Sequence, residues 1–412
     1  MGSRFLKYLG ILCMAVCILG SRALAAETLV GISDELAGDA NEERNETEAA
    51  AGAENAEHVQ EEGFVEEKLS QMTAEEKTAQ MFIVLPEALL GIDAVTAAGE
   101  MTQAAINELP VGGLIFMEQN LESPAQVQEM MKNLQAYSMD RTGLPLFTCI
   151  DEEGGSVARI SGRFENVPYI GDMCEIGASR DANAALETGR TMGAYLAELG
   201  FNVDFAPDAD VLSNPDNEIV KYRSFGDEPQ LVSEMAQKLL GGLEESGVFG
   251  CLKHYPGHGA TVGDTHEGYA YTDKTLEELR QCELVPFADG VARGVDFIMA
   301  GHISVPQIQG DNTPASLSKV MITDILRDEL GYDGLVVTDA LNMGAVAEIY
   351  SSGEAAVQAV LAGNDLILMP EDFTEAYNAV LSAVKDGTIS ESRLDESVRR
   401  IIKVKQKISR LQ

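Results

Sequence analysis

Short runs of apolar residues recur along the chain, separated by longer stretches in which Ala, Leu, Glu and Lys have helical spacing. Because each run is apolar throughout, it is typical of a strand buried on both faces, as in a parallel sheet covered by helices. Eight such runs are present: MFIVL (81–85), GGLIFM (112–117), PLFTCID (145–151), NVDFAPD (202–208), GCLKHY (250–255), DFIMAGHI (296–303), GLVVTDA (334–340) and DLILMP (365–370). Eight strands alternating with helices predict an α/β fold, a single (β/α)8 TIM-type barrel.

The barrel is expected to occupy residues 66–412. Thr73 and Glu76 have the spacing of a helix capping box, which marks the first helix near the start of the ordered domain. The last amphipathic stretch, LDESVRRIIKVKQKI, is expected to complete the outer ring of helices. No residues are left over for a second domain.

Residues 1–25 have the pattern of a secretory signal peptide. Arg4 and Lys7 precede an apolar run at 8–20, and Ala23-Leu24-Ala25 forms a small-x-small cleavage site. The run is too short to favour a membrane-spanning helix. We therefore expect a secreted protein; retention at the membrane by an uncleaved peptide is the less favoured alternative.

Residues 26–65 are expected to form a disordered acidic linker. Between Glu27 and Glu67 there are fourteen Asp or Glu residues against one Arg, with few large apolar residues. The whole chain has a net charge of −38, which disfavours nucleic acid and anionic membranes as partners. A solvated spacer is the simplest interpretation of the linker, and an interaction tail is the alternative. No obligate protein partner is evident.

Cysteine usage indicates buried thiols. Four cysteines follow the predicted signal peptide, and their irregular spacing in a large chain does not indicate a disulfide framework. Cys149 and Cys251 lie inside apolar runs, where a small buried thiol is the usual state.

Polar residues fall at the ends of five of the predicted strands. The catalytic residues of barrel enzymes lie at the C-terminal ends of the strands, so these residues are candidates for a shared site. They are Asp151 on the third strand, Asp208 on the fourth, Lys253 and His254 on the fifth, His302 on the sixth and Asp339 on the seventh.

The segment KHYPGHGATVGDTHEG (253–268) contains three of the five histidines of the chain. His254 and His258 have the spacing of zinc ligands on a helix, but Pro256 and Gly257 disfavour a helix there. The glycines do not have the spacing of a phosphate-binding loop. A mobile catalytic loop following a strand is the favoured interpretation, and neither a metal nor a cofactor is expected.

The motif in this segment resembles that of glycoside hydrolase family 3, in the subgroup of β-N-acetylhexosaminidases that cleave N-acetylglucosamine linkages. The segment KHYPGHG followed by GDTHEG is similar to the signature of that subgroup. Further similar motifs occur in the same order: IDEEGGSVARI (150–160), YRSFGDEP (222–229) and VVTDALNM (336–343). The resemblance extends from about residue 69 to the C-terminus.

The resemblance implies a role for each residue at a matching position. Asp339 would be the nucleophile and His266 the general acid/base, with Asp264 as the partner of His266. The side chains expected to bind the sugar are Asp151, Arg159, Arg223, Lys253 and His254.

These implied roles are chemically consistent. A histidine titrates near neutral pH, so His266 could exchange a proton without strong burial. In an extended stretch residues i and i+2 point to the same side, so Asp264 could hold one nitrogen of that ring. Asp339 could instead be a helix N-cap. Glu152 and Ser156 replace residues frequent in the subgroup, which bears on the leaving side of the substrate.

The predicted function is that of a retaining exo-β-N-acetylglucosaminidase acting on cell-wall or chitin-type glycans. Its substrate would be a carbohydrate with a terminal β-linked N-acetylglucosamine. The alternatives are phosphorolysis of the same linkage, a β-glucosidase of the same family, a metal-dependent hydrolase and a non-catalytic wall-glycan binding protein.

Overall fold

The structure, a computed structural model, describes residues 60–265, 268 and 270–411. The predicted signal peptide, most of the predicted linker and His266 lie outside the described residues. The chain divides into two units, Met1–Phe64 and Val65–Gln412. The description below concerns the second unit.

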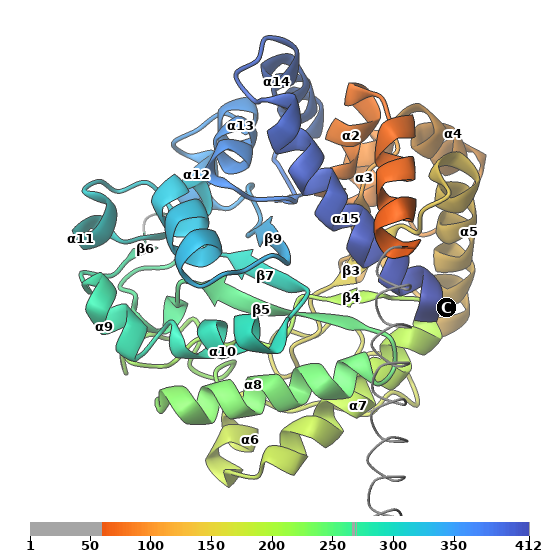
Figure 1. Cartoon of the computed structure of the whole chain (residues 1–412). Helices are drawn as coiled ribbons and strands as arrows, with labels where there is room; N and C mark the ends of the chain where they lie inside the picture. The colour runs from red at the N-terminus through yellow and green to blue at the C-terminus, as the bar shows by residue number, and fades with distance from the viewer. Residues whose placement is uncertain (1–59, 266–267, 269, 412) are drawn as a thin grey trace, which may run out of the picture. The chain divides into compact units, whose positions relative to one another are not determined.

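Eight parallel strands form the central sheet (Figure 1). They are β1 (Phe82–Val84), β2 (Gly113–Ile115), β3 (Phe147–Ile150), β4 (Val203–Asp204), β5 (Phe249–Tyr255), β7 (Phe297–Ala300), β9 (Leu335–Thr338) and β10 (Ile367–Leu368). The strand order is β10-β1-β2-β3-β4-β5-β7-β9. A parallel bridge between Val337 and Leu366 links the two ends of this order, which gives a nearly closed barrel. The predicted TIM-type barrel is confirmed.

The sixth predicted strand, 296–303, is divided in two in the structure. β7 ends at Ala300, and the chain then leaves the barrel to form β8 (Ile303–Ser304), which pairs with β6 (Ala270–Tyr271) in a separate two-stranded sheet. The break falls at Gly301, where an added Cβ would lie 3.0 Å from the Cβ of His254. The apolar run was continuous, so the sequence pattern did not show this break.

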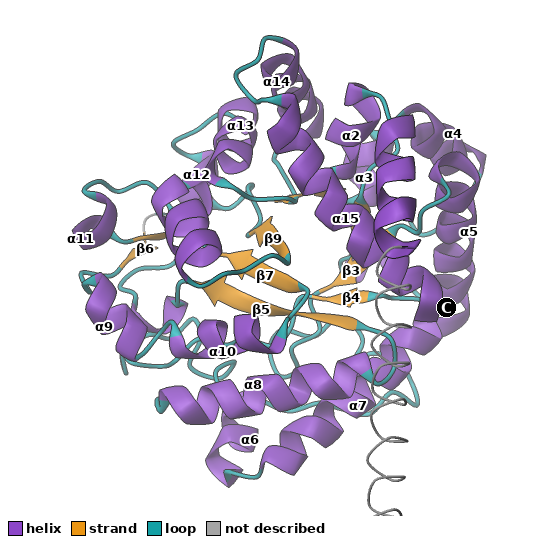
Figure 2. Ribbon diagram, in the orientation of Figure 1, coloured by secondary structure: helices purple, strands orange, loops and turns teal. Residues whose placement is uncertain are grey.

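Helices enclose the strands (Figure 2). A helix covers residues 60–71. The α-helices that follow are α2 (Ala74–Gln80), α3 (Pro86–Leu90), α4 (Glu100–Glu108), α5 (Pro124–Thr142), α6 (Met173–Ser179), α7 (Ala182–Leu199), α8 (Pro229–Glu244), α9 (Leu276–Gln281), α10 (Val285–Arg293), α11 (Pro306–Gln309), α12 (Gly344–Ala347), α13 (Ser352–Ala362), α14 (Phe373–Lys385) and α15 (Glu391–Leu411). Short 3-10 turns cover Glu118–Asn120, His258–Ala260 and Ala315–Leu317, and a π-helix covers Val320–Glu329.

The predicted capping box at α2 is confirmed. The Thr73 hydroxyl accepts from the backbone N–H of Glu76, and the Glu76 carboxylate accepts from the backbone N–H of Thr73. The helix at 60–71 precedes it, so the boundary that we placed after residue 65 lies inside a helix.

The last helix, α15, lies across the N-terminal ends of the strands, although we expected it in the outer ring. Lys405 Nζ lies 4.9 Å from the centre of the Phe147 ring at the start of β3. Arg400 and Lys407 bind Asp365 and Asp296, which precede β10 and β7. In Figure 1 this helix passes in front of β3. Its amphipathic pattern predicted burial of one face correctly but could not show which surface would cover that face.

Two further expectations concern segments of low polarity. The four described cysteines are free, and Cys149 and Cys251 are buried as expected. Among the described residues, no helix combines the length and apolar character that a bilayer crossing requires.

Lys405 should make the stability of the protein depend on pH. Its side chain is fully buried, with Gln80 Oε1 at 2.8 Å. Burial lowers the pKa of Lys405 to about 7, whereas an unfolded chain keeps the lysine proton up to about 10.4. Between these values the unfolded chain binds more protons, so stability should rise with pH.

The test compares the wild type with Lys405→Met by denaturant unfolding at pH 7 and pH 10. The free energy of unfolding of the wild type, relative to the variant, should increase by about 3 kcal/mol over this range. Lys407→Met, on the same helix, is the control because its exposed ion pair contributes little. A wild-type-to-Lys405→Met difference that stays constant with pH would contradict a buried titrating amine.

Candidate active site

The C-terminal ends of the strands enclose a cavity of about 290 Å³, at the lower end of the range for small-molecule sites. Its lining combines polar and apolar side chains, which suits a molecule with both hydroxyl groups and C–H faces. The polar lining residues are Asp151, Glu153, Arg159, Arg223, Lys253, His254, His258, Thr265, Asp339 and Asn342. The apolar ones include Ile115, Met117, Val157, Ile219, Met299, Met343, Leu368 and Met369.

A buried ion-pair network forms one wall of the cavity. Lys253 Nζ lies 2.9 Å from Asp151 Oδ1 and 2.6 Å from Glu153 Oε1. Arg223 donates to both carboxylate oxygens of Glu153, at 2.7 and 2.8 Å. Glu153 therefore forms ion pairs with both cations, and it is itself almost completely buried.

These groups keep their charges because each has an opposite charge beside it. Burial would raise the pKa of Glu153, but Arg223 and Lys253 hold it well below its ordinary value. Burial would lower the pKa of Lys253, but Asp151 and Glu153 raise it above the usual value. Two anions thus balance two cations in the cavity wall, and loss of one partner would leave a buried unpaired charge.

Glu152 holds the loop that carries Arg159. The Glu152 carboxylate is buried and accepts hydrogen bonds from the backbone N–H groups of Arg159, Ile160 and Ser161, at 2.6, 3.0 and 2.7 Å. The Tyr195 hydroxyl donates to the same carboxylate at 2.8 Å. The Arg159 guanidinium, by contrast, has no hydrogen bond or ion pair to another described residue. It lies at the cavity with its donors available.

Asp339 follows β9 directly and lies at the cavity with 9% of its surface exposed. Burial would raise the pKa of its carboxyl group, but His302, His254, Lys253 and a hydrogen bond from the Ala340 N–H hold it below its usual value. Asp339 is therefore an ionised carboxylate that is almost fully buried. It is not a helix N-cap, because α12 begins at Gly344 with Met343 as its cap.

His302 supports the chain next to Asp339. Its Nε2 lies 2.9 Å from the carbonyl oxygen of Ala340, which can only accept, so Nε2 carries the proton. Its Nδ1 lies 2.7 Å from the Ser316 hydroxyl. His302 thus fixes the backbone that follows the carboxylate.

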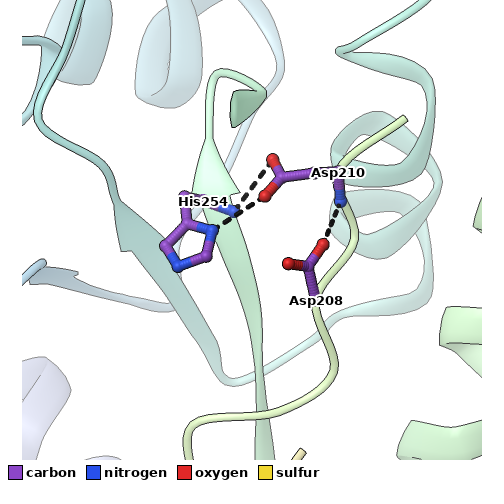
Figure 3. A group of neighbouring side chains, drawn as sticks. All are labelled: Asp208, Asp210 and His254. Carbon is purple, nitrogen blue, oxygen red and sulfur yellow. Dashed lines mark hydrogen bonds and ion pairs between the residues drawn. The ribbon is translucent and has the colours of Figure 1, made fainter. Parts of the chain in front are cut away.

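His254 is oriented by Asp210, as Figure 3 shows. The Nδ1 of His254 lies 2.8 Å from Asp210 Oδ2, and a carboxylate can only accept, so Nδ1 carries the proton. The other ring nitrogen, Nε2, lies 3.3 Å from Arg223 Nη2, which can only donate. In the neutral ring Nε2 is then the acceptor, and it lies at the cavity.

Asp208, Asp210 and His254 also offer ligand atoms within 4.8 Å of one another, a grouping that could hold a cation. Two observations favour a hydrogen-bonded cluster. Arg223 Nε lies 3.6 Å from Asp208 Oδ2, so a cation there would adjoin a guanidinium. Burial and the neighbouring Asp210 raise the pKa of Asp208 well above its usual value, which favours a neutral carboxyl group and a poor ligand.

The segment after β5 is attached to the barrel at several points. An added Cβ at Gly259 would lie 1.9 Å from the Val211 carbonyl oxygen, so only glycine permits this close approach. Val262 and Tyr271 pair with each other across the segment. Between them, the carbonyl of Thr265 accepts from the Ala345 N–H at 3.1 Å. The backbone beside Asp264 is therefore bound to α12 (Gly344–Ala347), the short helix that follows Asp339.

The structure brings six of the eight predicted site residues together at one cavity. These are Asp339, Asp151, Arg159, Arg223, Lys253 and His254. Asp264 is half-buried next to Thr265, which lines the cavity. His266 lies outside the described residues, and so does part of the loop that we predicted to be mobile.

The structure also places two neighbouring residues. The assigned strand β4 ends at Asp204, but a parallel bridge pairs Asp208 with Lys253 of β5, so Asp208 lies at the C-terminal end of this strand region as expected; it is buried and does not line the cavity. Glu152 is fully buried under its own loop, so its carboxylate faces backbone N–H groups and cannot contact the leaving side of a substrate.

Two contributing residues, Glu153 and Asp210, were missed; His302 was expected at a strand end, but its support of the chain next to Asp339 was not. Glu153 lies inside a motif that we quoted, and two adjacent acids after a buried strand were a usable signal. Asp210 gave no such signal, because its partner His254 is 44 residues away in the sequence.

The barrel and its charge-balanced cavity define a class, that of α/β barrels with a site for a small polar molecule at the C-terminal ends of the strands. The family description "Glycosyl hydrolase family 3 N terminal domain" matches residues 64–404. The chain therefore belongs to glycoside hydrolase family 3.

Individual relatives agree with this assignment. Beta-hexosaminidase A of Pseudoalteromonas piscicida is 34% identical over 327 residues, which are 74% of this chain and 54% of that protein. The beta-hexosaminidase of Nitrosomonas eutropha is 31% identical over 334 residues, which are 77% of this chain and 94% of that protein. The solved glycoside hydrolase family 3 beta-N-acetylglucosaminidase from Paenibacillus sp. str. FPU-7 is 38% identical, with a TM-score of 0.76 over 82% of this chain and 63% of that one.

The chain thus spans only part of two of these three proteins, 54% of the first and 63% of the solved structure. Their similarity establishes the family and the barrel. What the whole chain does is addressed below as a proposal.

Glu152→Gln should destabilise the protein by about 1–3 kcal/mol, because an amide N–H₂ would replace an acceptor that faces only donors. Tyr195→Phe removes one hydrogen bond to the same carboxylate and should cost about 1 kcal/mol. Denaturant unfolding of both variants measures the two losses. Equal losses would contradict the role of Glu152 in holding the Arg159 loop.

Proposed function

We propose that this protein is a retaining exo-β-N-acetylglucosaminidase that hydrolyses terminal β-linked N-acetylglucosamine. The observation that carries the proposal is the cavity itself, in which an ionised Asp339 lies with Asp151, Arg159, Arg223, Lys253 and His254. The naming of two relatives as beta-hexosaminidases and of one solved structure as a beta-N-acetylglucosaminidase supports it. The predicted signal peptide supports action outside the cytoplasm, on cell-wall or chitin-type glycans.

In this proposal Asp339 is the nucleophile. Retaining glycosidases form a covalent glycosyl intermediate on a carboxylate that attacks the anomeric carbon. A nucleophilic carboxylate must be ionised and held rigidly, and the lowered pKa and the contacts of Asp339 meet both requirements. Its oxygen would bond to the anomeric carbon as the glycosidic bond breaks, and water would later release the sugar.

His266 would be the general acid/base, with Asp264 holding its ring. As acid it would protonate the leaving oxygen, and as base it would take a proton from the attacking water. The hydrogen bond between Thr265 and Ala345 supports this assignment. It holds the residue between Asp264 and His266 to α12, the helix that follows Asp339. The Asp-Thr-His spacing remains the basis for the dyad.

The polar wall suits the hydroxyl and acetamide groups of a single sugar. Arg159 and Arg223 offer planar donors, and Lys253 offers a compact charge. The apolar lining residues, which include methionines and Ile219, suit the C–H face of a ring. A cavity of about 290 Å³ favours one terminal residue over an internal chain segment.

Aryl glycosides decide between this function and its alternatives. We expect turnover of an aryl β-N-acetylglucosaminide to exceed that of the matching β-glucoside, with the β-anomer of the free sugar appearing first by proton NMR. A preference for the glucoside would indicate a β-glucosidase, and first release of the α-anomer would exclude retention. Sugar 1-phosphate formed only with added phosphate would indicate phosphorolysis. Saccharide binding without any turnover would indicate a binding protein.

Two substitutions separate the proposed roles. Asp339→Ala should reduce kcat about 1,000-fold or more on every substrate, because no other nucleophile lies at that position. His266→Ala should reduce kcat strongly for a poor leaving group and less for an activated one, which needs little protonation. Equal losses by His266→Ala on both substrates would remove its role as the acid. Wild-type turnover by Asp339→Ala would remove the nucleophile.

A further inference from the structure

We propose that Asp210 is a positioning residue that sets the hydrogen-bonding direction of His254 and, through it, the recognition of a sugar hydroxyl. This inference rests on the proposed function for the identity of the ligand. The geometry of Asp210 and His254 stands independently of that function. Asp210 does not line the cavity and would not touch the substrate.

Asp210 is held in place by burial and by two hydrogen bonds of its backbone. Its side chain is fully buried. Its backbone N–H donates to Asp208 Oδ1 at 2.9 Å, and its carbonyl accepts from the Ser224 hydroxyl at 2.6 Å. The backbone N–H and carbonyl of Asp210 are therefore both held, independently of the contacts that its carboxylate makes.

The Asp210 carboxylate contacts the His254 ring and two backbone N–H groups. Oδ2 accepts from His254 Nδ1 at 2.8 Å, while Oδ1 accepts from the backbone N–H groups of His254 and His258, at 3.2 and 2.5 Å. Figure 3 shows the carboxylate facing the imidazole. One oxygen thus holds the ring, and the other holds the backbone at the start of the loop after β5.

The surroundings of Asp210 favour its ionised form. Burial would raise the pKa of Asp210, but His254, its hydrogen bond and His258 hold it below the usual value. An ionised carboxylate has no proton to donate, so all three groups that face it must be donors. When the His254 ring carries a single proton, that proton is therefore confined to Nδ1.

The consequence appears on the cavity side of the ring. His254 Nε2, an acceptor, lies 3.3 Å from Arg223 Nη2, a donor, and both residues line the cavity. A substrate hydroxyl that takes the place of this contact can donate to Nε2 and accept from the Nη2 N–H that otherwise points at the ring. A neutral imidazole with its proton on Nε2 would place two donors side by side and lose this match.

Asp210→Asn tests the proposal with little change of shape. The amide oxygen can still accept from the two backbone N–H groups, but the amide N–H₂ then faces Nδ1, and His254 must move its proton to Nε2. We expect kcat/KM on an aryl β-N-acetylglucosaminide to fall about 10- to 100-fold, mainly through KM, with an unchanged melting curve. Wild-type kcat/KM would overturn the proposal.

A double-mutant cycle shows whether Asp210 acts through His254. Asp210→Asn introduced into His254→Ala should change kcat/KM less than about threefold, because its target is already absent. Asp208→Asn is the matched control: it removes a buried carboxyl group two residues away that does not contact the His254 ring. Independent, multiplicative losses in the cycle, or an equal loss in Asp208→Asn, would indicate a general effect of changing a buried carboxyl group and overturn the proposal.

Nitrogen-15 spectra of the imidazoles read the tautomer without any activity. With His254 assigned by its loss in His254→Ala, the wild type at neutral pH should show a protonated Nδ1 and a bare Nε2, and Asp210→Asn should show the reverse. The same tautomer in both proteins would overturn the proposal. If the wild type turned over no glycoside but its tautomer responded as expected, the proposed function would fail while the positioning role would stand.

Discussion

The shared carboxylate of Glu153 is the interaction on which the candidate site depends. Arg223 and Lys253 are both cations and would repel each other, yet both lie in one cavity wall because Glu153 pairs with each. The position of Glu153 is set by its own loop, since its backbone N–H donates to the Val157 carbonyl at 2.8 Å. The same loop carries Asp151 and Arg159. A single short segment after β3 thus supplies a ligand-facing acid, a ligand-facing cation and the anion that holds Arg223 and Lys253.

The barrel and most of the cavity could be predicted from the sequence, because local pattern determines both. Fully apolar strands such as those at Phe147 and Leu335 indicate burial on two faces, and parallel strands in a barrel bring their C-terminal ends together. A polar residue directly after such a strand, such as Asp151 or Asp339, must therefore lie near the others. Once the barrel is inferred, no knowledge of loop structure is needed to place these residues.

The remaining features depend on loops and on contacts between distant residues. Asp210 and His254 belong to different loops, and nothing in either stretch indicates that one carboxylate faces the other ring. Glu152 and Glu153 are adjacent acids with opposite roles, one facing backbone N–H groups and the other facing cations. Only the turn of the chain between them decides which is which. The break after Ala300 was hidden for a similar reason, because an apolar run has the same appearance in one strand or in two.

The helix that covers the N-terminal end of the barrel has a consequence for biosynthesis. Contacts between α2 and α15 join residues more than 300 positions apart, such as Lys77 with Asp395 and Gln80 with Lys405. While a ribosome is still making α15, the N-terminal ends of the strands around Phe147 have no cover. The apolar end of the barrel then faces water. This end of the barrel can therefore be covered only after α15 has been made. Until then its apolar residues are open to proteases and to other unfolded chains.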